Sequence, residues 1–284
     1  MAGISANAAL ARLAVAPDFE YGKPRPDTEI LFLHRHLPDA ELYFLSNRKP
    51  RVEQIEASFR AAGREPEIWR AETGQAAPVS FRIQNQRTLI PLRLNPYESF
   101  FVVFRGPTTA ASRTVPEPAF APLATLDTGW TVSFQPGRGA PTVPQATSLG
   151  PWTGDSNAGI RYFSGTARYT KTLSVPTGWV SGKPRLVLDL GDVRELAEVF
   201  VNDRPLGVLW RPPYRVDVGD ALHAGDNHLE IRVTNLWVNR LIGDAQPGAE
   251  RVTFTIGLPY RADGPLRESG LLGPVRLERA PRQP

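Results

Sequence analysis

The stretch that decides the fold is Leu222–Asp244, which reads LHAGDNHLEIRVTNLWVNRLIGD. Residues 225–227 are Gly-Asp-Asn, which tolerate tight or left-handed backbone geometry and predict a turn. From residue 228 to residue 234 apolar and polar side chains alternate, and the apolar ones are Leu229, Ile231 and Val233. This period of two predicts a strand with one buried and one solvated face.

The alternation fails after Val233, because continuing it would place Asn235, Trp237 and Asn239 on the core face. A slip of one residue turns every side chain to the opposite face, so the strand is expected to end near Asn235. The next residues should then leave the sheet as a polar and aromatic loop. A loop with Trp, two Asn, Arg and Asp at the edge of a sandwich is where we expect function.

Composition narrows the class of protein. The chain has 284 residues, enough for two domains, and no cysteine, which excludes disulfides and thiolate metal sites. The net charge of +4 comes from scattered arginines, so nucleic acid is not an expected partner. No apolar run approaches the roughly 20 residues of a membrane span, so no membrane partner is expected either. With 28 prolines and 24 glycines, short strands joined by turns are favoured over long helices.

The chain divides into four predicted parts. Residues 1–27 hold a short helix near 7–14 and a lead-in segment, and residues 28–106 alternate as a small β-sandwich. Residues 107–122 are a Pro/Thr/Ala linker. Residues 123–284 carry short strands at intervals of about 8–12 residues, which predicts a second sandwich or jelly roll, with residues 252–256 as one strand. The fold class is therefore all-β with two β-sandwich domains.

Metal and cofactor chemistry finds little support in the sequence. His34 and His36 share a face of a predicted strand, but zinc needs a third protein ligand, so hydrogen-bonded histidines are favoured. Neither a G-x-S-x-G elbow nor a phosphate-binding glycine loop is present. No metal ligand is assigned and no cofactor is expected, although a structural calcium ion is left open. The paired acids Asp189/Asp192 and Glu195/Glu198 could serve glycoside hydrolysis, but their turn and strand positions favour a solvated role.

Aromatic and amide side chains of the second domain are the better clue. Flat rings accept the apolar face of a sugar, and Asn, Arg and Asp bind its hydroxyl groups. The alternative for any single ring is a place in the core. The candidate carbohydrate-binding residues are Tyr162, Trp210, Tyr214, Asn235, Trp237, Asn239, Arg240 and Asp244.

Several motifs resemble known glycoside hydrolases. The strand 166–175 ending at Pro176, the turn 199–203 (VFVND) and the GDN turn at 225–227 resemble the galactose-binding-like, sugar-binding jelly roll of family 2. Residues 159–165 (GIRYFSG) and 235–244 (NLWVNRLIGD) resemble family 106, the α-L-rhamnosidases. The first domain adds matches of the same kind at 16–19 (APDF), His34-Arg35 and 43–47 (YFLSN).

The resemblance implies the C-terminal region of an α-L-rhamnosidase. In that family a (β/α)₈ barrel N-terminal to these domains is expected to carry the catalytic acids and a calcium ion, and this chain has no eightfold strand–helix alternation. No catalytic residue is therefore assigned. The implied partners are a rhamnose-containing polysaccharide or glycoside and a catalytic barrel encoded upstream.

Three roles remain open at this point: a non-catalytic accessory region, a free-standing carbohydrate-binding module, or domains that only stabilise a parent hydrolase. No signal peptide is recognised, and the resemblance implies a periplasmic or extracellular location. The sequence leaves the sugar specificity and the oligomeric state open.

Overall fold

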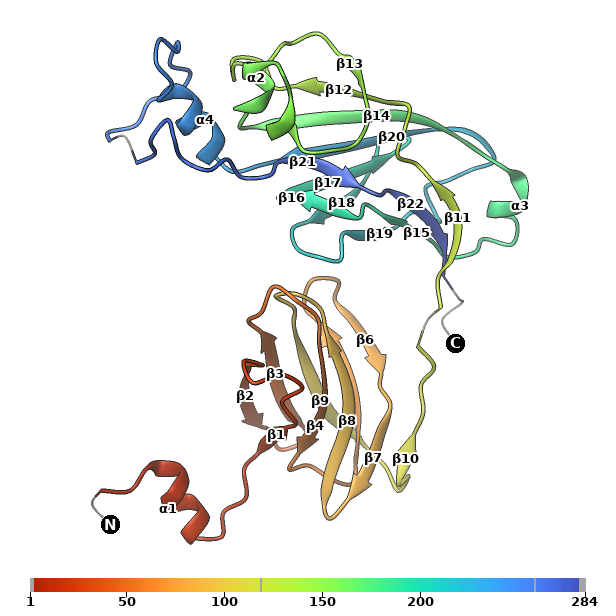
Figure 1. The fold of residues 1–284 in the computed structure, drawn as a ribbon. Helices are drawn as coiled ribbons and strands as arrows, with labels where there is room; N and C mark the ends of the chain where they lie inside the picture. Colours follow the sequence, from red (N-terminus) through yellow and green to blue (C-terminus); the bar gives the residue numbers. More distant parts are fainter. Residues whose placement is uncertain (1–2, 118, 258, 281–284) are drawn as a thin grey trace. The chain divides into compact units, whose positions relative to one another are not determined.

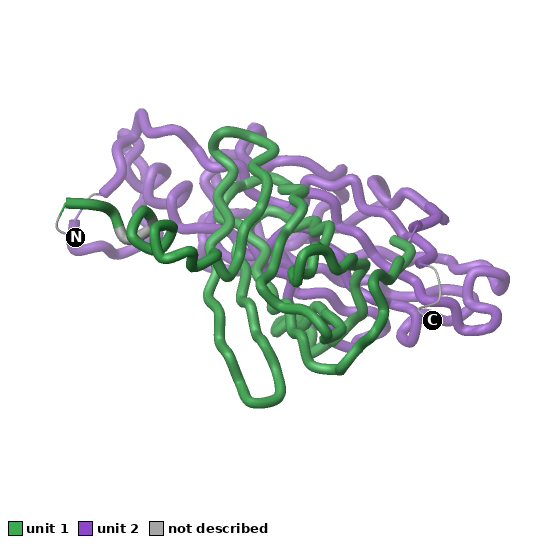
Figure 2. Tube along the Cα trace, turned by 90° about the horizontal axis from the view of Figure 1, so that it is seen from below, with its two compact units in different colours: residues 1–117 green, residues 118–284 purple. Residues whose placement is uncertain are grey.

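The computed structural model describes residues 3–117, 119–257 and 259–280. Its regular structure is dominated by antiparallel strands (Figure 1). The chain forms two compact units, residues 1–117 and 118–284, coloured separately in Figure 2. The predicted all-β fold with two β-sandwich domains is confirmed. Among the described residues, no helix combines the length and apolar character that crossing a bilayer requires.

Unit 1 is a sandwich of two five-stranded sheets, with strand orders β1-β4-β8-β7-β10 and β2-β3-β9-β5-β6. Its elements are α1 (Ala6–Arg12), β1 (Phe19–Tyr21), β2 (Ile30–His36), β3 (Glu41–Asn47), β4 (Glu53–Phe59), β5 (Arg64–Arg70), β6 (Gln75–Pro78), β7 (Phe81–Gln84), β8 (Arg87–Leu94), β9 (Ser99–Pro107) and β10 (Ser112–Arg113).

The core of unit 1 follows from strand alternation. In β4, Ile55, Ala57 and Phe59 are buried while the residues between them are more exposed. The Tyr43 ring of β3 meets the Phe59 ring edge-on at 4.9 Å, which joins the two sheets. The fully buried aromatic rings of this core dominate its packing energy.

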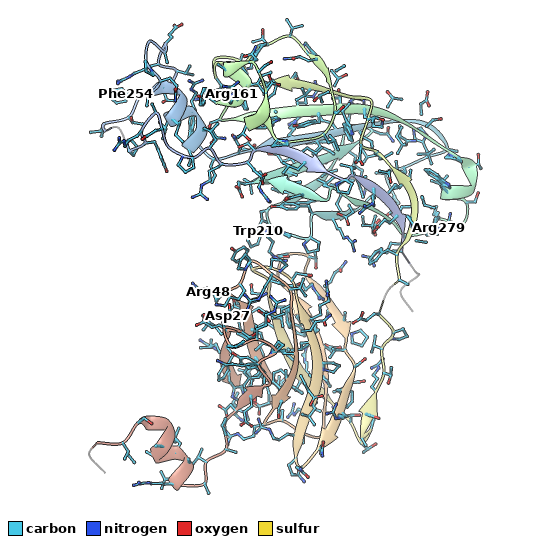
Figure 3. The ribbon with its side chains drawn as sticks, viewed as in Figure 1. Asp27, Arg48, Arg161, Trp210, Phe254 and Arg279 are labelled. Atoms are coloured by element: carbon cyan, nitrogen blue, oxygen red, sulfur yellow. The ribbon has the colours of Figure 1, made fainter. Side chains whose placement is uncertain are left out.

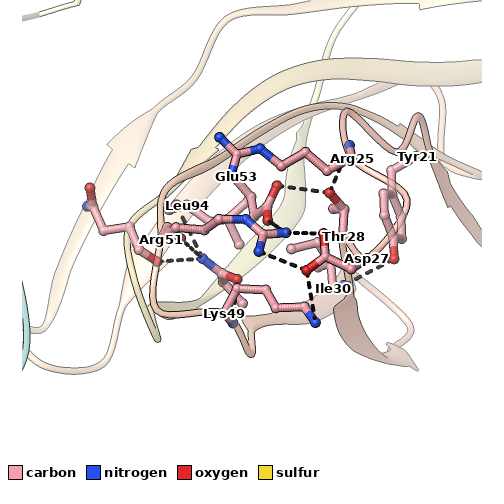
Figure 4. Close-up of polar contacts among 11 residues, drawn as sticks. Tyr21, Arg25, Asp27, Thr28, Ile30, Lys49, Arg51, Glu53 and Leu94 are labelled. Atoms are coloured by element: carbon pink, nitrogen blue, oxygen red, sulfur yellow. Dashed lines mark hydrogen bonds and ion pairs between the residues drawn. The ribbon is translucent and has the colours of Figure 1, made fainter.

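One end of unit 1 is tied by a buried carboxylate (Figure 4). Glu53 is 1% exposed. Its carboxylate accepts a hydrogen bond from the Thr28 hydroxyl (3.0 Å) and forms an ion pair with Arg51 (2.8 Å). Arg51 also donates two hydrogen bonds to Asp27, at 2.7 and 2.8 Å. Arg51 thereby links the loop before β2 to the start of β4.

Unit 2 contains sheets of six, four and two strands, in the orders β13-β12-β14-β20-β17-β18, β11-β22-β15-β19 and β16-β21. Its elements are β11 (Ala121–Thr125), β12 (Trp130–Phe134), β13 (Gln145–Thr147), η1 (Trp152–Gly154), α2 (Ala158–Arg161), β14 (Thr166–Val175), α3 (Thr177–Val180), β15 (Leu186–Asp189), β16 (Asp192–Arg194), β17 (Leu196–Val201), β18 (Arg204–Leu209), β19 (Arg215–Asp217), β20 (Gly225–Thr234), α4 (Val238–Asp244), β21 (Gly270–Gly273) and β22 (Arg276–Arg279).

Strand β20 lies between β14 and β17 in the six-stranded sheet and pairs with β14 along all ten of its residues. The predicted inward residues Leu229, Ile231 and Val233 are at most 2% exposed. They pack in one apolar cluster with residues of the four-stranded sheet, such as Leu188 and Leu277. The pattern of the sequence is therefore confirmed for this strand.

Two local predictions are wrong. The segment after Asn235 is the helix α4 rather than a loop, and residues 252–256 form no strand. Phe254 and Ile256, which alternate with polar residues in that predicted strand, are 90% and 102% exposed. Alternation alone predicted that strand, but in the part of the chain that the structure describes no neighbouring strand pairs with these residues through backbone hydrogen bonds.

The predicted domain limits at 106/107 and 122/123 stay predictions. The structure places the short strand β10 inside the stretch assigned to the linker.

Candidate functional site

Helix α4 is fastened to the sheet by side-chain amides. The Asn235 amide donates to the Phe163 carbonyl and to the Ser269 hydroxyl, both at 2.9 Å, and its oxygen accepts from the Gly165 N–H. Asn239 donates to the Arg267 carbonyl at 2.7 Å and accepts from the Arg267 N–H at 2.8 Å. These amides are therefore occupied by the protein itself.

Two further contacts fix where α4 starts. The Ser164 hydroxyl donates to the Leu236 carbonyl at 2.8 Å and accepts from the Arg240 N–H at 3.1 Å. A helix leaves its first N–H groups without intrahelical partners. Ser164, from the segment before β14, supplies one of those partners.

The charged pair of α4 is buried. Arg240 Nε donates to Asp244 Oδ1 at 2.9 Å, and both side chains are 6% exposed. Asp244 also accepts from the Val252 N–H (3.1 Å), the Thr253 N–H (2.9 Å) and the Thr253 hydroxyl (2.5 Å). Burial raises the pKa of Asp244, but these hydrogen bonds and the Arg240 charge outweigh it, so the pKa lies below its usual value. Asp244 is therefore a carboxylate at neutral pH and anchors the segment 252–253.

A cavity of about 270 Å³ opens beside this anchor. Its lining includes Leu241, Asp244, Arg251, Thr253, Phe254 and Tyr260. Phe254 lies at the tip of the loop next to α4 (Figure 3). The volume of the cavity lies just below the range of about 300–1,000 Å³ that is typical of ligand pockets, and its lining joins aromatic rings to a few polar groups, as ligand pockets do.

Two polar groups of this lining are available to a ligand. In the described part of the chain, neither the Arg251 side chain nor the Tyr260 hydroxyl has a hydrogen-bond or ion-pair partner. Arg251 is exposed and Tyr260 is 38% exposed. An arginine and a phenol that face solvent beside an aromatic ring can bind sugar hydroxyl or carboxylate groups.

Trp237 stands near the start of α4 with its ring 46% exposed. The Arg138 guanidinium lies 4.7 Å from the ring centroid, a cation–π contact that covers one face. Tyr162 is half-buried and packs against Gly243 of α4. Of the sequence-predicted residues on this part of unit 2, Trp237 offers the most accessible ring.

Trp210 and Tyr214 lie elsewhere in unit 2. Tyr214 is 4% exposed, and its hydroxyl donates to the Glu195 carbonyl at 3.1 Å. Burial raises the pKa of Tyr214 to about 12. Trp210 is 55% exposed just after β18, well apart from Phe254 in Figure 3. The structure thus brings six of the eight predicted residues together around α4 and leaves these two out.

Sequence reasoning missed Arg251, Phe254 and Tyr260. The alternation of residues 252–256 predicts a strand, so Phe254 was not considered as a ligand contact. No sequence pattern marks these residues, because the hydrogen bonds from Val252 and Thr253 to the Asp244 carboxylate that hold this segment are visible only in the structure.

The described residues contain no group of three or more His, Asp or Glu side chains placed to hold a metal ion. His34 and His36 both contact Glu41, at 2.7 and 2.6 Å, and His34 also contacts Asp18 at 3.1 Å. These two histidines therefore link neighbouring elements of unit 1.

Family models match both units. Residues 1–83 match the model described as α-L-rhamnosidase, and residues 148–261 match the galactose-binding-like domain of glycosyl hydrolase family 2. The second match includes β14 to β20, helix α4 and the loop with Phe254.

Two relatives extend the comparison. The solved rhamnosidase from Novosphingobium sp. PP1Y is 44% identical over 96% of this chain, with a TM-score of 0.85. A putative β-glucuronidase from Formosa agariphila is 35% identical over 189 residues, 58% of this chain. The chain spans only 26% of the rhamnosidase and 16% of the putative β-glucuronidase. The resemblance stated from the sequence is thus confirmed: this chain is similar to a region of a rhamnosidase, with an α-L-rhamnosidase match in its first unit and a family 2 galactose-binding-like match in its second.

Proposed function

We propose that the chain is a non-catalytic accessory region of a glycoside hydrolase, and that it holds a glycan at the cavity between α4 and the residues 251–255 and 259–260. The observation that carries the proposal is this cavity of about 270 Å³, which lies inside a region matching a galactose-binding-like domain. Phe254 would stack on the apolar face of the sugar, and Arg251 and Tyr260 would bind its polar groups.

The state of the carboxylates supports a non-catalytic role. Glycoside hydrolysis uses two carboxyl groups about 5–10 Å apart, one of them a proton donor. In the described lining of the cavity the acidic residue is Asp244, which is held as a carboxylate by Arg240 and Thr253. Asp189 is ion-paired with Arg215 at 2.7 Å.

Incubation with an aryl α-L-rhamnoside tests the absence of catalysis. The purified chain should release no aryl alcohol above the rate without protein. Turnover near the usual enzymatic range, about 1 s⁻¹ or faster, would reject the proposal.

Calorimetric titration with methyl α-L-rhamnoside and a rhamnose-containing polysaccharide tests binding. A dissociation constant of about 1 mM is expected for a single sugar ring, and Phe254→Ala or Arg251→Ala should weaken it about tenfold. Trp210→Ala is the matched control, because it removes an exposed ring elsewhere in the same unit and should leave binding unchanged. Equal loss in the control variant would remove the cavity from the proposal.

A purely structural role is the second candidate. The observation that favours it is that the amides of Asn235 and Asn239 are fully used in fastening α4. Under that role no glycan would bind, and the Phe254→Ala variant would behave as the unchanged chain in every titration.

A further inference from the structure

The five-stranded sheet β2-β3-β9-β5-β6 of unit 1 carries large apolar side chains on both faces, although its other face also holds Arg35, Ser46 and Glu67. Its inner face contributes Tyr43, Leu45, Phe100 and Val102 to the core. Its other face carries Leu31, Leu33, Leu42, Phe44, Trp69 and Phe101, which we call the outer apolar face. An antiparallel sheet with one solvated side normally alternates apolar and polar residues. Apolar residues on both faces are the pattern of a sheet that is covered on both sides.

Strand register arranges this face as a continuous row. Leu33 lies opposite Phe44, and Phe44 lies opposite Phe101. Phe101 in turn lies opposite Trp69, so the row crosses four adjacent strands. The Phe44 and Phe101 ring centroids are 5.2 Å apart.

The exposed fractions of these side chains show that they cover one another from solvent only in part. Val103 lies between these side chains on the same face, and at 1% exposed it is buried by its neighbours although it does not belong to the core cluster. Leu33 and Leu31, at the edge strand β2, remain 58% and 43% exposed. An apolar patch of this kind marks an interaction surface.

The area of the face argues against a second copy of this chain. With a strand spacing of about 4.8 Å and a rise of about 3.3 Å per residue, four strands over about six residues give an apolar patch of about 400 Å². A stable complex of separate proteins buries about 800 Å² on each partner. A domain in the same polypeptide needs less area, because linkage raises the effective concentration.

The chemistry of the face argues against a glycan. The planes of the Phe44 and Phe101 rings are tilted by 56°, so they form no common platform for sugar rings. The one hydrogen-bonding side chain in the row is Trp69, whose Nε1 already donates to Glu67 at 2.9 Å. A dry protein surface fits such a face better than a hydroxyl-rich ligand.

The comparisons favour another domain of a rhamnosidase-like polypeptide as the partner that covers the outer apolar face. The α-L-rhamnosidase model match, residues 1–83, includes β2, β3 and β5, which carry five of the six residues of the outer apolar face. In the solved rhamnosidase the region similar to this chain is 26% of the polypeptide, so most of that chain lies outside it.

We propose that the outer apolar face docks onto the catalytic domain of a glycoside hydrolase in the same polypeptide. This inference rests on the proposed accessory function and names the surface through which it acts. Leu31 and Leu33 form the exposed margin of the contact, and Phe44, Phe101 and Trp69 form its centre.

Cysteine accessibility tests this proposal, because the natural chain has no cysteine. Leu33→Cys is placed in the free chain and in a chimera in which the whole chain replaces the similar region of the Novosphingobium sp. PP1Y rhamnosidase. Maleimide labelling at position 33, followed by peptide mass, should be about tenfold or more slower in the chimera, since a docked side chain reacts only when the contact opens. Gln54→Cys is the control, because residue 54 is exposed on the other sheet of the same unit.

Each outcome decides the proposal. Slower labelling at position 33 with unchanged labelling at position 54 supports it. Equal labelling at position 33 in the free chain and in a chimera that hydrolyses rhamnoside overturns it. Protection in the free chain that grows with protein concentration also overturns it, because a second copy would then cover the face. Glycan binding by the free chain without hydrolysis is measured separately, so the proposed function can stand when this surface fails.

Discussion

Tyr162 lies so close to the main chain of Gly243 that a Cβ built on Gly243 would be 2.5 Å from the Cβ of Tyr162. Real Cβ atoms do not approach other carbon atoms to this distance. Helix α4 can therefore pack on the segment before β14 only because residue 243 has no side chain.

Gly243→Ala should destabilise unit 2 by about 1–3 kcal/mol, the usual cost of overpacking. The sign of this change in unfolding free energy is informative, because a Gly to Ala change inside an unobstructed helix stabilises the helix by about 1 kcal/mol. Urea unfolding followed by tryptophan fluorescence measures the change, since five of the six tryptophans lie in unit 2. Gly178→Ala in α3, where an added Cβ meets nothing within 4 Å, is the control and should not destabilise. A midpoint for Gly243→Ala equal to that of the control would contradict the packing.

Asp244→Asn should destabilise unit 2 by about 3 kcal/mol at pH 7, because it leaves the buried Arg240 without its charged partner. The pKa of Asp244 is lowered in the folded chain. Its carboxylate therefore stabilises the fold above the unfolded pKa of about 4, and that contribution is lost as the pH falls through the lower folded value. The free energy of unfolding is measured for the unchanged chain and for Asp244→Asn between pH 7 and pH 3. The difference between the two values should become smaller only below about pH 4. A gap that is constant over this range would contradict the ionised state of Asp244.

His34→Ala should destabilise unit 1 by about 2 kcal/mol. The substitution removes contacts to Asp18 and Glu41 and the stacking of the His34 ring on Tyr43, whose centroids are 4.1 Å apart. His36→Ala is the matched control, because that side chain is 74% exposed and contacts only Glu41. Hydrogen exchange of peptides from β2 measures the effect, and faster exchange in both variants alike would contradict it.

Arg51→Ala should destabilise unit 1, because Glu53 stays buried and keeps only the Thr28 hydroxyl as a partner. Asp27→Ala should lower the unfolding temperature less than Arg51→Ala does, since Asp27 is 57% exposed. Thermal unfolding of the two variants compares these contacts. A larger loss for Asp27→Ala would show that the exposed pair, rather than the buried carboxylate, orders this end of unit 1.

Much of the fold was predictable because buried apolar and exposed polar side chains alternate along the strands of a sandwich, with a period of two. The residues Leu229, Ile231 and Val233 show this directly, and the failure of alternation at Asn235 correctly predicted where β20 ends. The same rule failed for residues 252–256, because a period of two gives no information about whether a partner strand exists.

The candidate site was predictable only in part. The identity of the segment 235–244 as unusual came from its sequence, but its helix depends on Ser164 and Ser269, which lie far away along the chain. The position of Phe254 beside the cavity depends on the hydrogen bonds between Asp244 and Thr253. Such long-range contacts leave no local pattern. The assignment of the eight predicted residues as sugar contacts stays a prediction.

The most direct test of the accessory glycan-binding function is an NMR titration of the ¹⁵N-labelled chain with methyl α-L-rhamnoside up to about 20 mM, well above the expected dissociation constant of about 1 mM. Amide shifts should concentrate at Arg251, Thr253, Phe254 and Tyr260, with no sugar hydrolysis during the experiment. The absence of shifts at these residues, or the appearance of free rhamnose, would contradict the account.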